Sequence, residues 1–185
     1  MRTIIAYLLT VAIALSVSGT ASAAGQSEAS DAADFVSRTG IMVGDENGDL
    51  ALDASLTRAE LAVLLTRFHG GSGIEPEIYS WACYYTDVPD WAKSYVGYCT
   101  ANLLLNGYGD SLYGPYDPVT VQMACTVMLR IIDKSGGWDY GTACSYAQEI
   151  GLLKQDTPPG DPVTRGDMAI LIYRAYQRVY PAMPM

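Results

Sequence analysis

Residues 55–67 read SLTRAELAVLLTR, and the same pattern returns twice further along the chain. It returns as PVTVQMACTVMLR at residues 118–130 and as PVTRGDMAILIYR at residues 162–174. Each stretch places a threonine just ahead of an apolar run with helical spacing, and threonine is a favoured helix N-cap. The sequence therefore predicts three similar helices, each beginning directly after its threonine.

A short apolar segment and a loop precede each of these helices. The first two copies align without a gap, and the loop of the third is shorter by four residues. Each copy reads as a first helix, a Gly-rich loop and a second helix, and one copy cannot bury its own apolar face. We predict an all-α fold in which three helix-loop-helix repeats close into a pseudo-three-fold helical prism. The expected repeats are residues 24–70, 79–134 and 138–180.

The first helix of the second copy is expected to run from about Trp91 to Leu105, because Val96, Cys99 and Leu103 share one face at helical spacing. Cys125 aligns with alanines on the other second helices. We therefore expect Cys99 and Cys125 to be neighbours in the core of the second copy. An exported chain permits disulfides, and four cysteines allow three connectivities. Either such bridges form, leaving Cys83 and Cys144 to find other partners, or all four stay reduced.

The N-terminus has the order of a secretory signal. Arg2 precedes the apolar run Ile4–Val17, and Ala21-Ser22-Ala23 has the small-x-small form of a cleavage site. The run of about 14 residues is short of the roughly 20 that span a bilayer. We expect residues 1–23 to be a signal peptide cleaved near Ala23, with no membrane association afterwards.

Composition excludes several classes of function. The net charge of −9 argues against nucleic acid, which calls for a basic surface. His69 is the single histidine, which leaves little for metal or general-base chemistry, so we expect no metal, no cofactor and no enzyme activity. The run from Asp45 to Asp49 superficially resembles a calcium loop. Leu50 and Leu56 stand where such a loop requires glycine and glutamate, so we expect a surface turn.

Several motifs together resemble the S-layer homology repeat. They are LTRAE at residues 56–60, YTDVPDWA at 85–92, GYGD at 107–110 and YGP at 113–115. The family pattern is an aromatic-x-Asp-Val start, a Trp-Ala, a Gly-rich loop and a Thr-Arg-Ala-Glu helix start, and the resemblance covers nearly the whole mature chain. It implies a three-fold helical prism that holds secreted proteins noncovalently on walls of the Gram-positive type. The implied partner is a secondary cell-wall polysaccharide attached to peptidoglycan, often one carrying pyruvate ketals.

No copy matches the family pattern completely. The first lacks the aromatic-Asp-Val start, and Glu28 stands near the place of its tryptophan. The second has Val121 and Met123 where arginine and glutamate are expected. The third keeps Trp138 without the Asp-Val-Pro.

The candidate ligand-binding residues are two arginines, three carboxylates and two tryptophans: Arg58, Glu60, Asp87, Trp91, Trp138, Arg165 and Asp167. A cation in the first turn opposes the helix dipole, so Arg58 and Arg165 either bind a ligand carboxylate or form ion pairs with a nearby aspartate. Glu60 also completes a capping box. Asp87 either pairs with an arginine or caps a helix, and Trp91 either stacks on a sugar or seats the first helix. We expect the best groove between the first and second copies, from Arg58, Glu60, Asp87 and Trp91.

Two functions remain open. The first is a carbohydrate-binding anchor at the cell wall or S-layer surface. The second is a scaffold whose sugar grooves have decayed and whose faces bind another surface protein.

Overall fold

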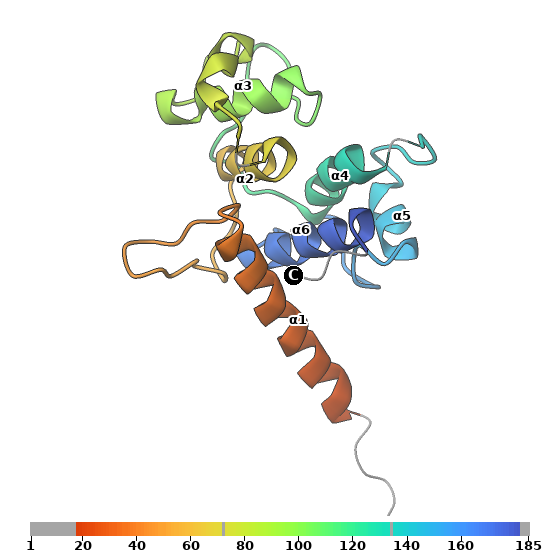
Figure 1. The fold of residues 1–185 in the computed structure, drawn as a ribbon. Coiled ribbons are helices and arrows are strands. Elements are labelled where there is room, and N and C mark those ends of the chain that lie inside the picture. The colour runs from red at the N-terminus through yellow and green to blue at the C-terminus, as the bar shows by residue number, and fades with distance from the viewer. Residues whose placement is uncertain (1–17, 72, 134, 182–185) are drawn as a thin grey trace, which may run out of the picture.

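The computed structural model describes residues 18–71, 73–133 and 135–181, and over these residues the chain is helical without a β-strand, which confirms the all-α class (Figure 1). The α-helices are α1 (Ser18–Arg38), α2 (Arg58–Gly70), α3 (Lys93–Ala101), α4 (Val121–Ile132), α5 (Ala143–Glu149) and α6 (Arg165–Val179). Two short 3-10 helices, η1 (Pro76–Ala82) and η2 (Asp90–Ala92), precede α3. The expected signal peptide falls mainly on residues 1–17, outside the described residues, so its cleavage stays a prediction.

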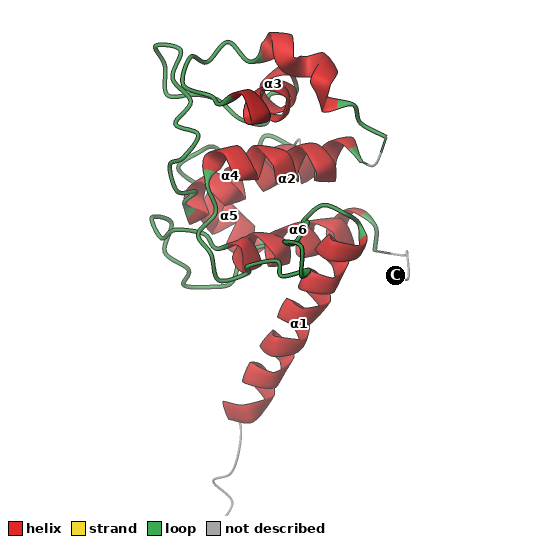
Figure 2. Ribbon diagram, turned by 90° about the vertical axis from the view of Figure 1, so that its left-hand side faces the viewer, coloured by secondary structure: helices red, strands yellow, loops and turns green. Residues whose placement is uncertain are grey.

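Along the chain the α-helices follow one another in three pairs, here called units: α1 with α2, α3 with α4, and α5 with α6. The first helix of a unit does not pack mainly on its own partner. Instead α3 packs on α2, α5 on α4, and α1 on α6. Figure 2 shows this stacking, with α3 above α2 and α1 running past α6. Each apolar face is therefore buried by a neighbouring unit.

A closed ring of three backbone hydrogen bonds joins the starts of α2, α4 and α6. The N–H of Leu56 donates to the carbonyl of Val163 at 3.0 Å, that of Val163 to Val119 at 2.8 Å, and that of Val119 to Leu56 at 2.9 Å. All three side chains are buried in the core. These residues occupy the same position in the three quoted stretches, so the ring links equivalent points of the three units.

The predicted N-caps are confirmed. Thr57, Thr120 and Thr164 have extended backbone, and each side chain accepts the N–H three residues on. Capping boxes form at the starts of α2 and α6, where Glu60 and Asp167 return a bond to the cap backbone. The start of α4 lacks this return bond, because methionine has no carboxylate.

The first helix of the second unit is shorter than predicted, because α3 ends at Ala101. Leu103 adopts a positive φ of 58°, and the N–H of Leu104 turns back to the carbonyl of Cys99 at 2.8 Å. This turn leaves Leu103 76% exposed, so its expected place on the core face is wrong. The equivalent positions in the other units hold Gly40 and Gly151, at φ values of 70° and 73°.

Replacing Leu103 by glycine is expected to raise the free energy of unfolding by about 0.5–1 kcal/mol. Glycine adopts positive φ without the steric cost of a Cβ, and little apolar burial is lost at this exposed position. Urea titration followed by circular dichroism would measure the change, with Leu104→Gly in the buried next position as a destabilised control. A loss of stability in Leu103→Gly would contradict the backbone assignment.

The four cysteines are free thiols, and their neighbours differ from the prediction. Cys99 lies against α2, with its sulfur 3.5 Å from the carbonyl of Ala62, and burial raises its pKa to about 12. The thiol of Cys125 instead contacts that of Cys144 on α5. Burial is the main cause that raises the pKa of Cys125, and the Cys144 thiol raises it further. The expected Cys99–Cys125 pair is wrong because first helices pack on the preceding unit.

Candidate anion-binding pocket

Arg58, the first residue of α2, buries its side chain inside the molecule, with 4% of the residue exposed. Its Nε donates to the carbonyl of Tyr113 at 2.9 Å, and its Nη2 donates to that of Asn106 at 2.8 Å. The rings of Tyr108 and Tyr113 have their centroids 4.6 and 4.5 Å from its Cζ. These contacts stabilise a buried cation that has no carboxylate within 4.0 Å among the described residues. The expected alternative, an ion pair with a nearby aspartate, is therefore not what holds it.

A pocket of about 240 Å³ opens beside this guanidinium. Arg58 and Arg130 both line it, and none of its lining residues is acidic, although the chain carries a net charge of −9. Tyr108 and Tyr140, 56% and 55% exposed, supply aromatic walls. Met123 places its sulfur 3.8 Å from Nη1 of Arg58. The pocket thus offers two positive charges between apolar faces, an arrangement that suits an anion with an apolar body.

Arg130 was not among the residues predicted from the sequence. It is the last residue of the second aligned segment, as Arg67 and Arg174 are of the first and third. Its Nη1 donates to the carbonyl of Leu104 at 2.7 Å, while its Nε and Nη2 have no hydrogen bond to any described residue. Burial lowers the pKa of the Arg130 guanidinium, but an arginine remains charged at neutral pH. One edge of its fork is therefore available to a ligand carboxylate.

The backbone N–H groups at the start of α2 are engaged within the protein. The N–H groups of Arg58 and Ala59 donate to the carbonyls of Asp117 and Pro115 at 3.0 and 2.9 Å. The N–H of the next residue is taken by the N-cap side chain. The loop of the second unit thus satisfies this helix start, and positive charge in the pocket comes from side chains instead.

Glu60 does not belong to the Arg58 pocket. Its Oε2 accepts from the N–H and hydroxyl of Thr57 at 2.8 and 2.6 Å, and its Oε1 lies 3.8 Å from Nη1 of Arg165. Residues two apart on a helix point about 200° apart, so Arg58 and Glu60 face different units. The predicted grouping of the two is therefore wrong.

Arg165 sits in a socket built like that of Arg58. Its Nε donates to the carbonyl of Leu50 at 2.7 Å, and Leu50 aligns with Tyr113. Its Nη2 lies 3.5 Å from the carbonyl of Val43, which aligns with Asn106. The socket differs in that a carboxylate stands beside it, so the charge of Arg165 is partly offset.

Asp87 holds the loop that surrounds Arg58. Its two carboxylate oxygens each accept a backbone N–H at 2.8 Å, from Tyr113 and Gly114. Burial acts to raise the pKa of Asp87, but these N–H groups and the nearby charge of Arg58 outweigh it, so the pKa lies below its usual value. The carboxylate shapes the pocket through the loop and does not line it.

Asp87→Asn is expected to lower the free energy of unfolding by about 1–2 kcal/mol at pH 7, because an amide has a single acceptor oxygen and its NH2 group would face the second N–H. Since the folded pKa is depressed, this stability is present above about pH 4 and is lost as pH falls through the folded value. Thermal melts at pH 7 and pH 3 should show the two proteins converging at the lower pH. Asp90→Asn, which alters an exposed pair with Lys93, should change little, and equal losses in both variants would contradict the role of Asp87.

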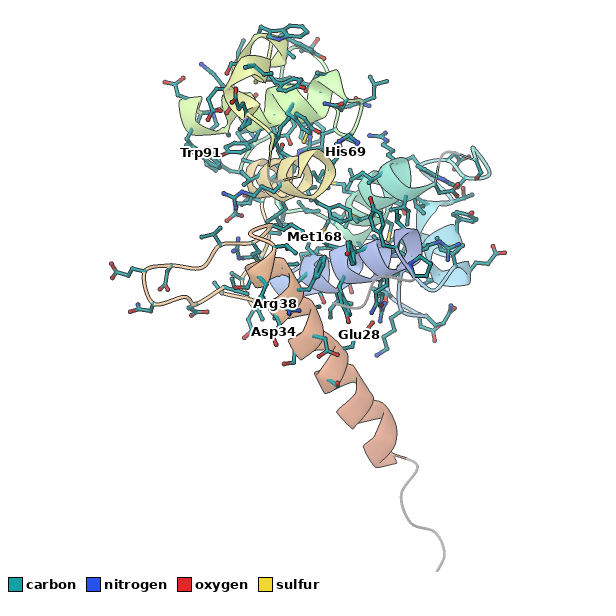
Figure 3. The ribbon with its side chains drawn as sticks, in the orientation of Figure 1. Glu28, Asp34, Arg38, His69, Trp91 and Met168 are labelled. Atoms are coloured by element: carbon teal, nitrogen blue, oxygen red, sulfur yellow. The ribbon has the colours of Figure 1, made fainter. Side chains whose placement is uncertain are left out.

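The remaining candidates lie elsewhere. Trp91 is 52% exposed in η2, which packs on α2, and it is not among the residues that line the Arg58 pocket (Figure 3). Trp138 is partly buried against the core, and its indole N–H has no hydrogen-bond partner among the described residues. Asp167 caps α6 and lines a separate pocket with Val121. Of the residues predicted for the best groove, only Arg58 lines this pocket.

Asp45 forms the expected surface turn, in which its carboxylate accepts the N–H groups of Asn47 and Asp49 at 2.8 and 2.9 Å. Within the described ranges no cluster of three or more metal-ligating side chains occurs. No helix in that part of the chain has the length and apolarity needed to cross a membrane.

Comparison with known proteins places the pocket loop within a family match. Residues 84–120, which include α3 and the loop around Arg58, match the S-layer homology domain. The chain is 28% identical over 186 aligned residues to the middle cell wall protein of Brevibacillus brevis, covering 91% of this chain and 17% of that protein. It is also 28% identical over 123 residues to a surface layer protein of Brevibacillus choshinensis, covering 62% of this chain and 11% of the relative.

An amylopullulanase of Thermoanaerobacterium thermosulfurigenes is 27% identical over 110 residues, which are 50% of this chain and 6% of the enzyme. The chain thus spans less than a fifth of the length of each of these relatives. The matched segment contains η2, α3 and the following loop, and it ends at Thr120, the N-cap of α4. Residues 84–120 of this chain are similar to the S-layer homology domain, and the relatives include proteins of the cell wall and surface layer.

Proposed function

We propose that this chain attaches noncovalently to the cell wall by binding an anionic secondary cell-wall polysaccharide in the pocket of Arg58 and Arg130. The observation that carries the proposal is the charge of that pocket: two arginines line it without an acidic residue, on a chain of net charge −9. A carboxylate such as that of a pyruvate ketal suits the free edge of the Arg130 fork. The exposed rings of Tyr108 and Tyr140 suit the apolar face of a sugar.

We also infer that the three helix-loop-helix units are copies of one module arranged with pseudo-three-fold symmetry. The ring of backbone bonds through Leu56, Val119 and Val163 supports this arrangement. The matching sockets of Arg58 and Arg165 support it as well, since aligned carbonyls accept from both. The proposed signal peptide would deliver the chain to the surface, where the relatives named for the cell wall and the surface layer would function.

Sedimentation with isolated walls tests the proposal. The purified mature protein should pellet with walls, and should stay in the supernatant after the secondary polymer has been extracted from them. Added soluble polymer should compete it off intact walls. Pelleting that is unchanged by extraction would reject polysaccharide binding.

A second function, binding to another surface protein, is favoured by exposed aromatic side chains near η1 and η2. Trp81, Tyr84 and Trp91 are 78%, 64% and 52% exposed. A scaffold of this kind should pellet with extracted walls as well as with intact ones, and should lose its binding when the walls are treated with protease.

A further inference from the structure

A second pocket, of about 380 Å³, lies at the start of α4 and resembles the Arg58 pocket residue by residue. Its Leu153 and Lys154 align with Leu105 and Asn106 of the first pocket, and its Leu171 and Arg174 align with Val127 and Arg130. Arg174 also copies the anchoring bond, since its Nη1 donates to the carbonyl of Leu152 at 3.2 Å, as Arg130 does to that of Leu104 at 2.7 Å.

The two pockets differ in the hydrogen-bond partners of Nε and Nη2 of the aligned arginines. In the second pocket, Nε and Nη2 of Arg174 each donate to a carboxylate oxygen of Glu28, both at 2.7 Å. In the first, the corresponding atoms of Arg130 have no hydrogen bond to a described residue. Glu28 reaches the pocket from α1, which packs on α6 beside it (Figure 3).

The geometry of the Glu28 contact is that of bidentate carboxylate recognition by arginine. The hydrogen bond from Arg174 is the main cause that lowers the pKa of Glu28, so the side chain is an anion at neutral pH. Glu28 lines this pocket and stands near the place where the family pattern calls for tryptophan.

We propose that the pocket around Arg174 is a second carboxylate-binding site, and that Glu28 fills it as a built-in occupant and keeps ligand out. This inference rests on the proposed function, because it takes the Arg58 pocket, which Arg130 also lines, as the open form of the same site. A tethered carboxylate acts at an effective concentration on the order of millimolar or more, so a weakly binding sugar acid competes poorly with it. Glu28 thereby reduces the number of ligand sites on the chain.

Removing Glu28 should open the site without making it equal to the first. Asp161 and Asp167 also line the second pocket, and they remain in the variant. Both are exposed, and Asp167 is also engaged in the capping box of α6. The opened pocket should therefore bind a carboxylate more weakly than the Arg58 pocket does.

Titration with methyl glucuronide tests this inference, with methyl glucoside as the uncharged control. The readout is the Nε–H signals of Arg130 and Arg174 in nitrogen-15 spectra, assigned with the two Arg→Gln variants. In the wild-type protein only Arg130 should respond. In Glu28→Ala both arginines should respond saturably, so that the number of sites rises from one to two. Glu28→Gln, which keeps the side-chain volume, should give the same gain if the alanine variant folds poorly.

The outcomes separate the two proposals. An Arg174 signal that stays unchanged in folded Glu28→Ala and Glu28→Gln would overturn the inference. So would an Arg174 response in the wild-type protein, because Glu28 would then not close the pocket. If Arg174 responds in the variants while Arg130 responds in none of the proteins, the built-in occupant stands and the proposed role of the Arg130 pocket fails.

Discussion

Arg58→Met is expected to lower the free energy of unfolding by about 2–4 kcal/mol. The substitution removes the donors to the buried carbonyl of Tyr113 and to the partly buried carbonyl of Asn106. It also removes the cation from between two tyrosine rings. Because both carbonyls belong to the second unit, the loss falls on the contact between the first and second units.

Arg165→Met provides a matched control for this effect. Arg165 occupies the same helix position, but its side chain is 15% exposed and its second carbonyl contact is longer, at 3.5 Å. We expect it to lose about 1 kcal/mol. Urea unfolding of both variants, followed by far-ultraviolet circular dichroism, measures the difference. Equal small losses would mean that the buried cation contributes nothing to the contact between units.

Arg130→Gln is expected to weaken binding to soluble wall polymer by about ten- to a hundredfold, the effect of losing a charge-assisted bond of about 1.5–3 kcal/mol. The fold should be nearly unaffected. A single hydrogen bond to the carbonyl of Leu104 is at stake, the position is partly exposed, and the glutamine amide is still a donor. Calorimetric titration with purified polymer measures the affinity, and its dependence on salt should decrease in the variant.

Arg67→Gln is the control for this second prediction. Arg67 occupies the corresponding position in α2, where its Nη1 donates to the carbonyl of Ile41 at 3.4 Å. It does not line the Arg58 pocket. Its replacement should leave polymer affinity within about twofold, since no charge in the pocket changes. If Arg67→Gln and Arg130→Gln weaken binding equally, the effect is one of net charge and the pocket is not the site.

The pattern of helix starts could be predicted because local interactions determine it. A threonine cap, a carboxylate three residues on and an apolar run at helical spacing act within a few residues of one another. Thr57 and Glu60 therefore form the expected capping box. The end of α3 was misjudged because Leu103 has an apolar side chain in a position that requires positive φ, and apolar periodicity alone does not register that requirement.

The composition of the pocket could not be predicted, because it depends on which units meet. The sequence placed Arg58, Glu60, Asp87 and Trp91 in one groove, whereas the structure turns Glu60 to Arg165 and seats η2 on α2. The cysteines show the same limit, since Cys99 lies against the first unit rather than beside Cys125. Arg130 could have been found from its alignment, but the sequence does not show that Glu28 engages Arg174 while no described residue engages Nε and Nη2 of Arg130.

The helical class, the three helix starts and the similarity of residues 84–120 to the S-layer homology domain all follow from the sequence. These features depend on backbone hydrogen bonds, caps and apolar spacing within single segments of the chain. Packing between units, in contrast, sets which arginine lines a pocket without an acidic residue and which is paired with Glu28. The net charge of a pocket is the sum of the charges of side chains from α1, α4, α6 and their loops. The distances between these side chains are set by packing between units rather than by the order of the helices along the chain.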